Sequence, residues 1–364
     1  MSRPGIRAGE KGSFMTGGTD APRRGAVRSR PASQAKPCFA ALDLGTNNCR
    51  LLVAAEDGAG FRVVDGYSQI VRLGEGLAAT GRLSDAAMAR AYHALKACAE
   101  RLAWRRPVAV GCIATQACRI AANGPRFLAR VKQDLGLDFE IISAEEEARL
   151  SVLGCASLID PAADLALIVD IGGGSTELAW LDAKAAYESV RAGGLDPPMR
   201  AWTSTPVGVV NLSEDDPEPP TDRAAWYESL VTRIATSFAP NAETAPLRPA
   251  FEAGGAHIIG TSGTVTSLAG VHLNLKRYQR SRVDGLWMSA VECRETIARL
   301  AAQTHGERAA NPCIGRDRAD LVVHGGAILE AVMRVWPVER VRVADRGLRE
   351  GVLMRLMAQH RVRK

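Results

Sequence analysis

One short pattern occurs twice in the chain, and it constrains the fold more than any other feature of the sequence. Each copy has an aliphatic strand that ends in aspartate, then a turn containing glycine, then a second apolar strand. The first copy spans residues 39–55 with Asp43 at the end of its first strand, and the second spans residues 165–180 with Asp170 there. Two such copies in one order indicate an internal duplication of a β-rich unit.

The segments around the two copies alternate between strand and helix patterns. Ser84 precedes a helix that runs to about residue 102, and Ser143 precedes a helix over residues 145–153. A serine in this position accepts a hydrogen bond from a free amide of the first helical turn. Further strands are predicted over residues 61–70, 107–113 and 139–142. Further helices are predicted over residues 127–135, 223–238, 289–301 and 319–335. Residues 260–264 form a glycine loop, and the Pro-rich acidic stretch 214–220 is predicted to be a surface loop.

An aspartate at a strand end followed by a glycine turn can bind phosphate and a metal together. Glycines let backbone amides approach an anion closely, and a carboxylate binds the hard cation that offsets phosphate charge. Two tight hairpins that merely need glycine remain the alternative for the loops after Asp43 and Asp170. A P-loop is excluded because the sequence has no GxxxxGK[ST], and a dinucleotide fingerprint is excluded because residues 172–174 lead into a strand.

Three glutamates begin the helix after Ser143. Such a cluster is commonly surface charge that complements the helix dipole. Hydrolysis of a phosphoanhydride, however, needs a group that orients or deprotonates water, and carboxylates crowded together have raised pKa values that suit proton acceptance. Arg50 after the first loop and Arg119 in the segment ATQACR are candidates for gripping phosphate oxygens.

The net charge of +6 belongs to the N-terminal tail, because residues 1–36 carry eight basic and two acidic residues, whereas the remaining 38 basic and 38 acidic residues cancel. The tail is predicted to be disordered. It is either an electrostatic tether for a polyanion or an extension without function, with Met15 as the start of the protein. We favour the second interpretation, and no specific nucleic-acid partner is expected.

Eight cysteines occur without a CxxC pair or a Cys/His metal spacing, and several lie in aliphatic runs. Free, buried thiols are typical of a reducing compartment. No apolar stretch reaches the roughly 18 residues of a membrane span, and no secretory signal follows the first charges. A cytoplasmic protein without membrane contact is therefore expected.

Taken in order, the motifs resemble the exopolyphosphatase/guanosine pentaphosphate phosphohydrolase (Ppx/GppA) family from about residue 39 to residue 356. The resemblance rests on the segments AALDLGTNNCRLLV, ATQACRIAANG, ISAEEEARL, LIVDIGGGSTELAW, TPVGVVNL, GTSGT, RADLVVHGGAILEA and VADRGLREGVL.

The resemblance implies an α/β fold of two ribonuclease-H-like domains, as in the actin-like and acetate and sugar kinase superfamily, around a central cleft. The domains would span residues 37–145 and 146–345, and the C-terminal helix of residues 346–364 would pack back on the first of them. The chain is similar to the short, two-domain members of the family.

The resemblance also implies roles for particular residues. Glu147, the last glutamate of the EEEAR match, would be the general base for the attacking water, and Arg119 the phosphate-facing arginine. Mg²⁺, with Mn²⁺ as the alternative, would be held partly through water by three carboxylates, Asp43, Asp170 and Glu177. The residues that would bind phosphate are Gly45, Thr46, Asn47, Asn48, Arg50, Gly172, Gly173, Gly174, Ser175 and Thr176.

The expected activity is release of terminal phosphate from inorganic polyphosphate. Removal of the 5′-phosphate of pppGpp to give ppGpp, as in the stringent response, is the first alternative. A non-catalytic regulator that binds ppGpp or polyphosphate is the second, and the presence of all four candidate carboxylates argues against it. A kinase fits less well because no acceptor-substrate motif is present. The resemblance leaves room for a homodimer.

Overall fold

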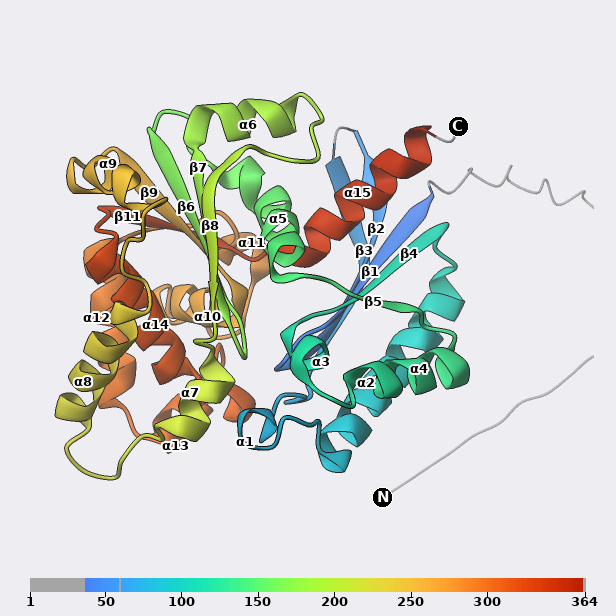
Figure 1. Cartoon of the computed structure of the whole chain (residues 1–364), viewed down its shortest axis with the longest axis horizontal. Coiled ribbons are helices and arrows are strands. Elements are labelled where there is room, and N and C mark those ends of the chain that lie inside the picture. The colour runs from blue at the N-terminus through green and yellow to red at the C-terminus, as the bar shows by residue number, and fades with distance from the viewer. Residues whose placement is uncertain (1–36, 59, 363–364) are drawn as a thin grey trace, which may run out of the picture. The chain divides into compact units, whose positions relative to one another are not determined.

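The structure is a computed structural model that describes residues 37–58 and 60–362, and these residues form two β-sheets with helices on their faces (Figure 1). The N-terminal tail, with the tether and start-site hypotheses, lies outside the described residues. The first sheet has the order β3-β2-β1-β4-β5. Its strands are β1 (Cys38–Leu44), β2 (Asn48–Asp57), β3 (Gly60–Ile70), β4 (Ala109–Ala114) and β5 (Phe139–Ile141).

The second sheet has the order β10-β11-β9-β6-β7-β8. Apart from the edge strand β10, this is the order of the first sheet, with three antiparallel strands followed by two parallel ones. Its strands are β6 (Leu165–Ile171), β7 (Thr176–Asp182), β8 (Met199–Thr205), β9 (Ala256–Thr261), β10 (Trp287–Ser289) and β11 (Arg340–Ala344). We call each sheet with the helices packed on it a lobe, the first and the second in chain order.

The register of the strands confirms that the chain repeats one unit. Asp43 pairs with Arg50 across β1 and β2, and Asp170 pairs with Glu177 across β6 and β7. Both aspartates therefore lie near the carboxyl end of the first strand of a lobe, one position before the strand ends. The predicted fold class, α/β with two ribonuclease-H-like halves, is confirmed.

Side chains that alternate along β1 build two separate cores. Leu42 and Leu44 point to the face that α2 (Asp85–Arg105) and α4 (Gly124–Leu135) cover. Phe39 and Ala41 point to the opposite face, against α15 (Leu348–Val362). Alternation of this kind follows from the two-residue period of a strand. Ser84 caps α2 as predicted, its hydroxyl accepting from the Ala87 amide.

The second sheet is also covered on both faces. Leu167 and Val169 of β6 belong to the core that contains α8, α10, α12 and α14, whereas Ala166 and Ile168 face α5 and α6. The helices and short 3₁₀ turns of this half are α6 (Ala183–Arg191), α7 (Val209–Asp215), α8 (Arg223–Thr236), η2 (Ala245–Leu247), α9 (Arg248–Glu252), α10 (Ser262–His272), α11 (Arg280–Val283), α12 (Ala290–Ala302), α13 (His305–Ala310), η3 (Arg316–Arg318) and α14 (Val322–Val335); those elsewhere are α1 (Leu77–Thr80), α3 (Gln116–Ile120), α5 (Ala144–Cys155) and η1 (Ala156–Leu158).

Helix α5 lies between the two sheets, where Figure 1 shows it crossing α15. Leu150 of α5 packs in the core of the first lobe, and Val152 packs in a core of the second. The crossing is close because glycines line it: a Cβ on Gly154 would lie 2.0 Å from the Gly347 carbonyl oxygen, and one on Gly351 would lie 2.1 Å from that of Leu150. The division into domains at residue 145 stays a prediction.

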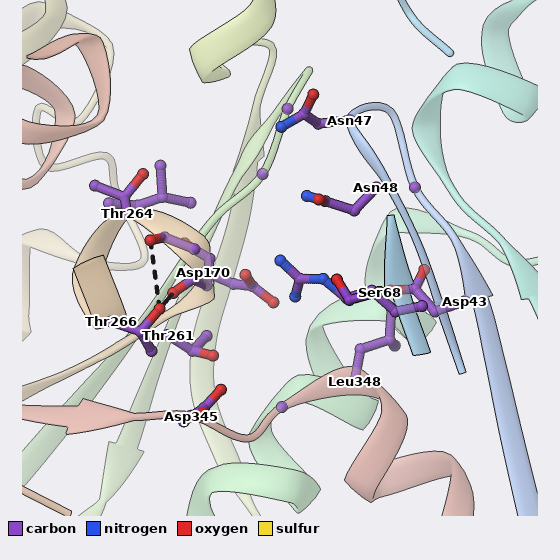
Figure 2. Close-up of a pocket in the computed structure, with 18 of the residues that line it drawn as sticks. Asp43, Asn47, Asn48, Ser68, Asp170, Thr261, Thr264, Thr266, Asp345 and Leu348 are labelled. Atoms are coloured by element: carbon purple, nitrogen blue, oxygen red, sulfur yellow. Dashed lines mark hydrogen bonds between the residues drawn. The ribbon is translucent and has the colours of Figure 1, made fainter. Parts of the chain in front are cut away.

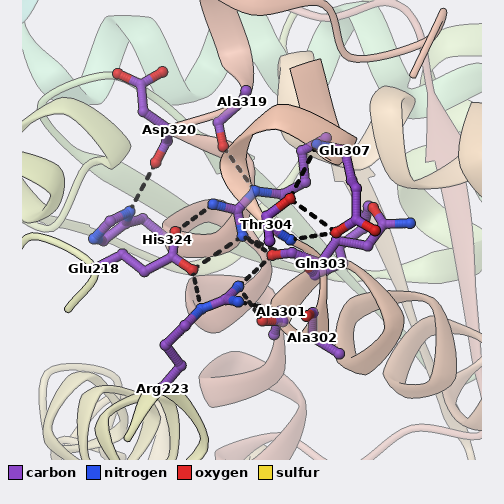
Figure 3. A network of polar contacts seen from close by, with 12 residues as sticks. Glu218, Arg223, Ala301, Ala302, Gln303, Thr304, Glu307, Ala319, Asp320 and His324 are labelled. Atoms are coloured by element: carbon purple, nitrogen blue, oxygen red, sulfur yellow. Dashed lines mark hydrogen bonds and ion pairs between the residues drawn. The ribbon is translucent and has the colours of Figure 1, made fainter. Parts of the chain in front are cut away.

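The acidic stretch at residues 214–220 is largely the surface loop that the sequence predicts, because residues 216–220 form no helix or strand and residues 214, 215, 217 and 220 are exposed. Glu214 lies inside α7, which ends at Asp215. Glu218 pairs with Arg223 (Figure 3) and with the fully buried Arg308. Arg308 also donates to the carbonyls of Leu300, Gln303 and Ala319. A buried guanidinium needs this full set of acceptors, so the ion pairs of Glu218 fix the position of the loop.

The eight cysteines are all free thiols. In residues 37–58 and 60–362, no helix combines the length and the apolarity that crossing a bilayer would require.

Candidate active site

A cavity of about 700 Å³ opens between the two lobes, where both Asp-Gly loops meet. It is lined by the turn after β1, the turn after β6, the loop at residues 260–264 and residues 344–350. Figure 2 shows Asn47 and Asn48 of the first lobe facing Asp170 and Thr264 of the second. Both predicted phosphate loops therefore border one space, although they are more than a hundred residues apart in the chain.

The first loop is braced from outside by the segment that follows β3. The Asn47 carbonyl accepts from the amides of Val71 (2.8 Å) and Arg72 (3.0 Å), and the Thr46 carbonyl accepts from that of Gly74 (2.9 Å). The side-chain oxygens of Asn47 and Asn48 are buried without a partner in the described part of the chain. The turn is thus held by its carbonyls, while its polar side chains remain available at the cavity.

The second loop is braced in the same way by α7. The Gly172 carbonyl accepts from the Val209 amide (3.1 Å), and the Gly173 carbonyl accepts from the Val210 amide (2.7 Å). In a trans peptide the N–H that follows a carbonyl points in the opposite direction. The amides of Gly173 and Gly174 therefore point away from α7, and among the described residues neither donates to a backbone carbonyl. Successive free amides of this kind form an anion-binding concavity.

Glu147 lies in the first turn of α5, whose N-cap Ser143 accepts from the Glu146 amide as predicted. The Glu147 carboxylate lines the cavity, and its Oε2 accepts a hydrogen bond from Arg119 Nη1 at 3.2 Å. Arg119 also donates to the Ile142 carbonyl at 2.7 Å. Burial, and next the charge of Glu177, raise the pKa of Glu147 well above its usual range. A buried carboxyl group of raised pKa, fixed in orientation by an arginine, is suited to accepting a proton.

Two further carboxyl groups stand close to Glu147. Burial, with the charge of Asp170 next, raises the pKa of Glu177 to about 7, and the Ser204 hydroxyl donates to it at 2.7 Å. The Ser151 hydroxyl donates to Asp170 at 2.7 Å, and burial raises the pKa of that carboxyl also. The duplicated strand ends and the start of α5 thus gather negative charge in one place.

Asp43 completes the set from the first lobe. Burial raises its pKa to about 6 against the opposing charges of Arg50 and Arg349, and its Oδ1 is buried with no hydrogen-bond partner among the described residues. Within the described part of the chain no three His, Cys, Asp or Glu side chains come together as a ready metal cage. An orphaned, buried carboxylate oxygen opposite Asp170 fits a cation that shares its coordination with phosphate oxygens and water, which is how Mg²⁺ is commonly bound.

Five arginines line the cavity, and two of them, Arg280 and Arg346, pair with carboxylates. The other three are Arg50, Arg318 and Arg349, of which sequence reasoning identified only Arg50. Burial, with the charges of Arg349 and Arg318, lowers the pKa of Arg50. None of the three forms an ion pair with a carboxylate within residues 37–58 and 60–362. Arg318 has only a 3.4 Å contact with Ser267, and its guanidinium carbon lies 3.7 Å from where a Cβ on Gly263 would be. Guanidinium groups that have no carboxylate partner are suited to binding phosphate oxygens.

The predicted site residues divide into two groups. Those that line the cavity are Asp43, Gly45, Thr46, Asn47, Asn48, Arg50, Glu147, Asp170, Gly172, Gly173, Gly174 and Ser175. Arg119, Thr176 and Glu177 do not line it. Arg119 is hydrogen-bonded to the Glu147 carboxylate. The hydroxyl of the fully buried Thr176 donates a hydrogen bond to the Val207 carbonyl at 2.6 Å. Arg318, Arg349 and Gln116 line the cavity without having been predicted. The two arginines lie in helix or turn patterns, and Gln116 lies in the segment ATQACR, of which only the arginine was selected.

Comparison with known families identifies the family of the whole chain. The model of the Ppx/GppA phosphatase family matches residues 52–360. The chain belongs to this family. The family resemblance of the motifs is thereby confirmed.

Similar proteins share most of their length with this Ppx/GppA chain. Exopolyphosphatase 2 of Mycobacterium tuberculosis is 29% identical over 333 residues, which is 87% of this chain and 98% of the relative. The crystal structure of the Aquifex aeolicus Ppx/GppA family member is 26% identical, with a TM-score of 0.69 over 89% of this chain and 98% of that chain. An exopolyphosphatase structure from Cytophaga hutchinsonii, at 24% identity and a TM-score of 0.74 over 88% and 98% of the two chains, is similar in fold.

Proposed function

We propose that this chain is a Mg²⁺-dependent exopolyphosphatase that releases terminal phosphate from inorganic polyphosphate by attack of water. The observation that carries the proposal is Glu147, a buried carboxyl group of raised pKa at the wall of a cavity whose other walls offer free amides and unpaired arginines. Proton acceptor and anion-binding groups are the two requirements for hydrolysis of a phosphoanhydride. Family membership and the similarity to a mycobacterial exopolyphosphatase support the same substrate class.

In the proposed mechanism the terminal phosphates lie between the two loops. Amides of the loop at residues 172–175 and the side chains of Asn47 and Asn48 bind the phosphate oxygens, and Arg50, Arg318 and Arg349 bind the charges further along the chain. Mg²⁺ near Asp43 and Asp170 would supply neutralisation of the developing charge. Glu147 takes a proton from water aligned with the bond to the leaving phosphate. Arg119 orients the Glu147 carboxylate, and the charge of Glu177 helps to keep the pKa of Glu147 high.

The first test is Glu147→Gln. This change keeps the size of the side chain and removes the proton acceptor, so phosphate release is expected to fall by at least about 100-fold, within the range that general-base catalysis contributes. Binding of tripolyphosphate, measured by titration calorimetry, should persist. Glu145→Gln is a matched control because Glu145 lies in the same helical turn, is exposed and pairs with Arg149. Substantial phosphate release by Glu147→Gln would remove Glu147 from the mechanism.

The second test compares substrates. Phosphate release is measured from short polyphosphate, long polyphosphate and pppGpp, each with Mg²⁺, with Mn²⁺ and with a chelator. The proposal expects release from polyphosphate that the chelator abolishes. Binding of polyphosphate without release from any of the three would instead support a regulator that lacks catalysis.

Hydrolysis of pppGpp is the second candidate function, and the extent of the cavity favours it. Beyond the two loops the cavity continues past Ser262 and Gly263 to Tyr278 and Arg280. A volume of about 700 Å³ is within the range of sites that enclose a small organic ligand. A nucleoside could pack against the ring of Tyr278 and the apolar lining residues Pro312 and Ile314, whereas a polyphosphate chain has no apolar group to place there. Faster release from pppGpp than from short polyphosphate would establish this candidate.

A further inference from the structure

The carbonyl of Gly174 receives two side-chain donors that come from opposite lobes. Nε2 of Gln116, in α3 of the first lobe, donates to it at 3.0 Å. Nδ2 of Asn211, in α7 of the second lobe, donates to it at the same distance. Asn211 belongs to the element that already braces this loop, so its bond needs no contact between lobes. The bond from Gln116 exists only where the two lobes meet.

Gln116 also contacts the first phosphate loop. The Thr46 hydroxyl lies 3.5 Å from Gln116 Oε1. A Cβ placed on Gly174 would stand 1.7 Å from the same oxygen and 3.2 Å from the Thr46 hydroxyl oxygen. One amide side chain thus fills the contact between the loops, with its N–H on one of them and its oxygen toward the other. Its length and its position are both fixed by neighbours.

Fixing the Gly174 carbonyl determines the direction of the next amide. The peptide between Gly174 and Ser175 is planar, so its N–H points opposite to its carbonyl. With the carbonyl held toward Gln116 and Asn211, the Ser175 amide points away from them, like the preceding two amides of the loop. Among the described residues the Ser175 amide donates to no backbone carbonyl. Three consecutive amides are then aligned for one anion.

We infer that Gln116 is a positioning residue that couples approach of the two lobes to the orientation of the Gly174–Ser175 peptide. With the lobes together, Gln116 and Asn211 both hold the Gly174 carbonyl, and the Ser175 amide faces the substrate. With the lobes apart, Asn211 alone holds it and the peptide can rotate. The inference rests on the proposed phosphate-binding function of the loop, and it assigns Gln116 no contact with the reacting atoms.

The experiment replaces Gln116 with Met, which has a similar shape and no donor, and with His, whose ring N–H can reach a similar distance. Gln116→Met is expected to raise the KM for short polyphosphate about 10-fold, the factor that one net hydrogen bond contributes, while kcat changes less than about 2-fold. Gln116→His is expected to restore most of the affinity. The melting temperature without ligand should not change. Gln133→Met, at an exposed glutamine of α4, is the control.

A second measurement follows the amides directly, by hydrogen exchange of the peptide that contains residues 173–176. In the Glu147→Gln protein, tripolyphosphate should protect these amides; in Glu147→Gln with Gln116→Met it should protect them much less. If Gln116→Met matches Gln133→Met in both measurements while the unmodified protein is active, the inference is wrong. An unmodified protein that releases no phosphate would instead contradict the proposed function, and the exchange measurement would still report on Gln116.

Discussion

His257 shows how one buried side chain makes stability depend on pH. It lies fully buried in β9, its ring edge packs on Trp287, and its Nε2 accepts from the Asp160 amide at 3.4 Å. Burial, with the positive charge of Arg340 next, lowers its pKa from 6.5 to about 4. His257 is therefore a buried structural residue that is hydrogen-bonded through Nε2.

The sign of the effect follows from where the proton binds. Below pH 6.5 the unfolded chain protonates His257 and the folded chain does not, so the free energy of unfolding falls as pH drops from 6.5 to about 4. The full loss is about 3 kcal/mol for a lowering of this size. We expect His257→Gln to lack this component when urea unfolding is measured between pH 7 and pH 4. His93→Gln, at an exposed position of α2, should follow the unmodified protein; parallel profiles for the unmodified protein and His257→Gln would contradict the prediction.

Site residues could be identified from the sequence by their type and their neighbours along the chain, but the direction of their side chains could not. Asp43 and Asp170 could be found because each follows an aliphatic strand and precedes glycine. Thr176 stands in the same motif, yet the pleat of β7 turns its hydroxyl to the Val207 carbonyl and away from the cavity. Arg318 and Arg349 could not be found, because an arginine in a helix or a turn is usually a surface residue.

Among the elements, α7 determines the shape of the second phosphate loop, and Gly208 at its N-cap allows the close approach. A Cβ on Gly208 would lie 2.4 Å from the Gly173 carbonyl carbon and oxygen. Both are backbone atoms, so no side-chain rotation relieves the contact. Gly208 has an extended backbone (φ −129°, ψ 160°) that alanine adopts without strain. The effect of a substitution there is therefore confined to the position of the loop.

We expect Gly208→Ala to displace the loop at residues 172–175 and to lower kcat/KM by about 100-fold, as a displacement near 1 Å can do at a site that depends on orientation. The far-ultraviolet circular dichroism spectrum should stay unchanged. Gly306→Ala is the control, because its Cβ would meet only the Thr304 hydroxyl oxygen, at 4.0 Å, and alanine favours the α13 helix. Equal kinetics for the two variants would show that α7 does not set the loop.

The elements that sequence predicted well are those whose signals are local. Ser84, Ser143 and Ser289 each accept a hydrogen bond from the first helical turn, and periodic apolar residues follow them. Helix α7 was missed because it has only seven residues and depends on contacts with a distant part of the chain. Its first two amides donate to the carbonyls of Gly172 and Gly173. Strand β8 was missed because it is an edge strand in which only Ala201 is buried, so it carries no apolar run. Tertiary contacts of this kind leave no local pattern.

For the molecule as a whole, the duplicated pattern predicted two halves, while the contacts between them required the structure. Arg72 of the first lobe pairs with Asp320 of the second at 2.8 Å across 248 residues of sequence, and the Gly76 amide donates to Glu214 at 3.1 Å. These contacts involve different parts of the two lobes from the bond between Gln116 and Gly174. No pattern of residue types along the chain specifies which charges meet after folding.

The Arg72–Asp320 pair gives a prediction about association of the lobes. Each side chain is about a third exposed, 34% and 35%, so solvent screens the pair and its coupling should be about 0.5 kcal/mol. If closure of the cavity is needed for substrate binding, losing the pair should raise the KM for short polyphosphate about 2-fold at low salt and leave kcat unchanged. The reason is that the pair stabilises the closed arrangement and contacts no reacting atom.

A double-mutant cycle with Arg72→Ala, Asp320→Ala and the combined variant isolates this coupling. The single variants should each raise KM, and the combined variant should raise it by less than the product of the two, because the second change removes no further ion pair. The coupling should shrink as salt rises from 50 to about 500 mM, since salt screens exposed charges. Arg130→Ala, which removes a pair with Asp134 on the outer helix α4, is the control. Strictly multiplicative effects at low salt would mean that Arg72 and Asp320 act on the substrate separately, and not through the contact between the lobes.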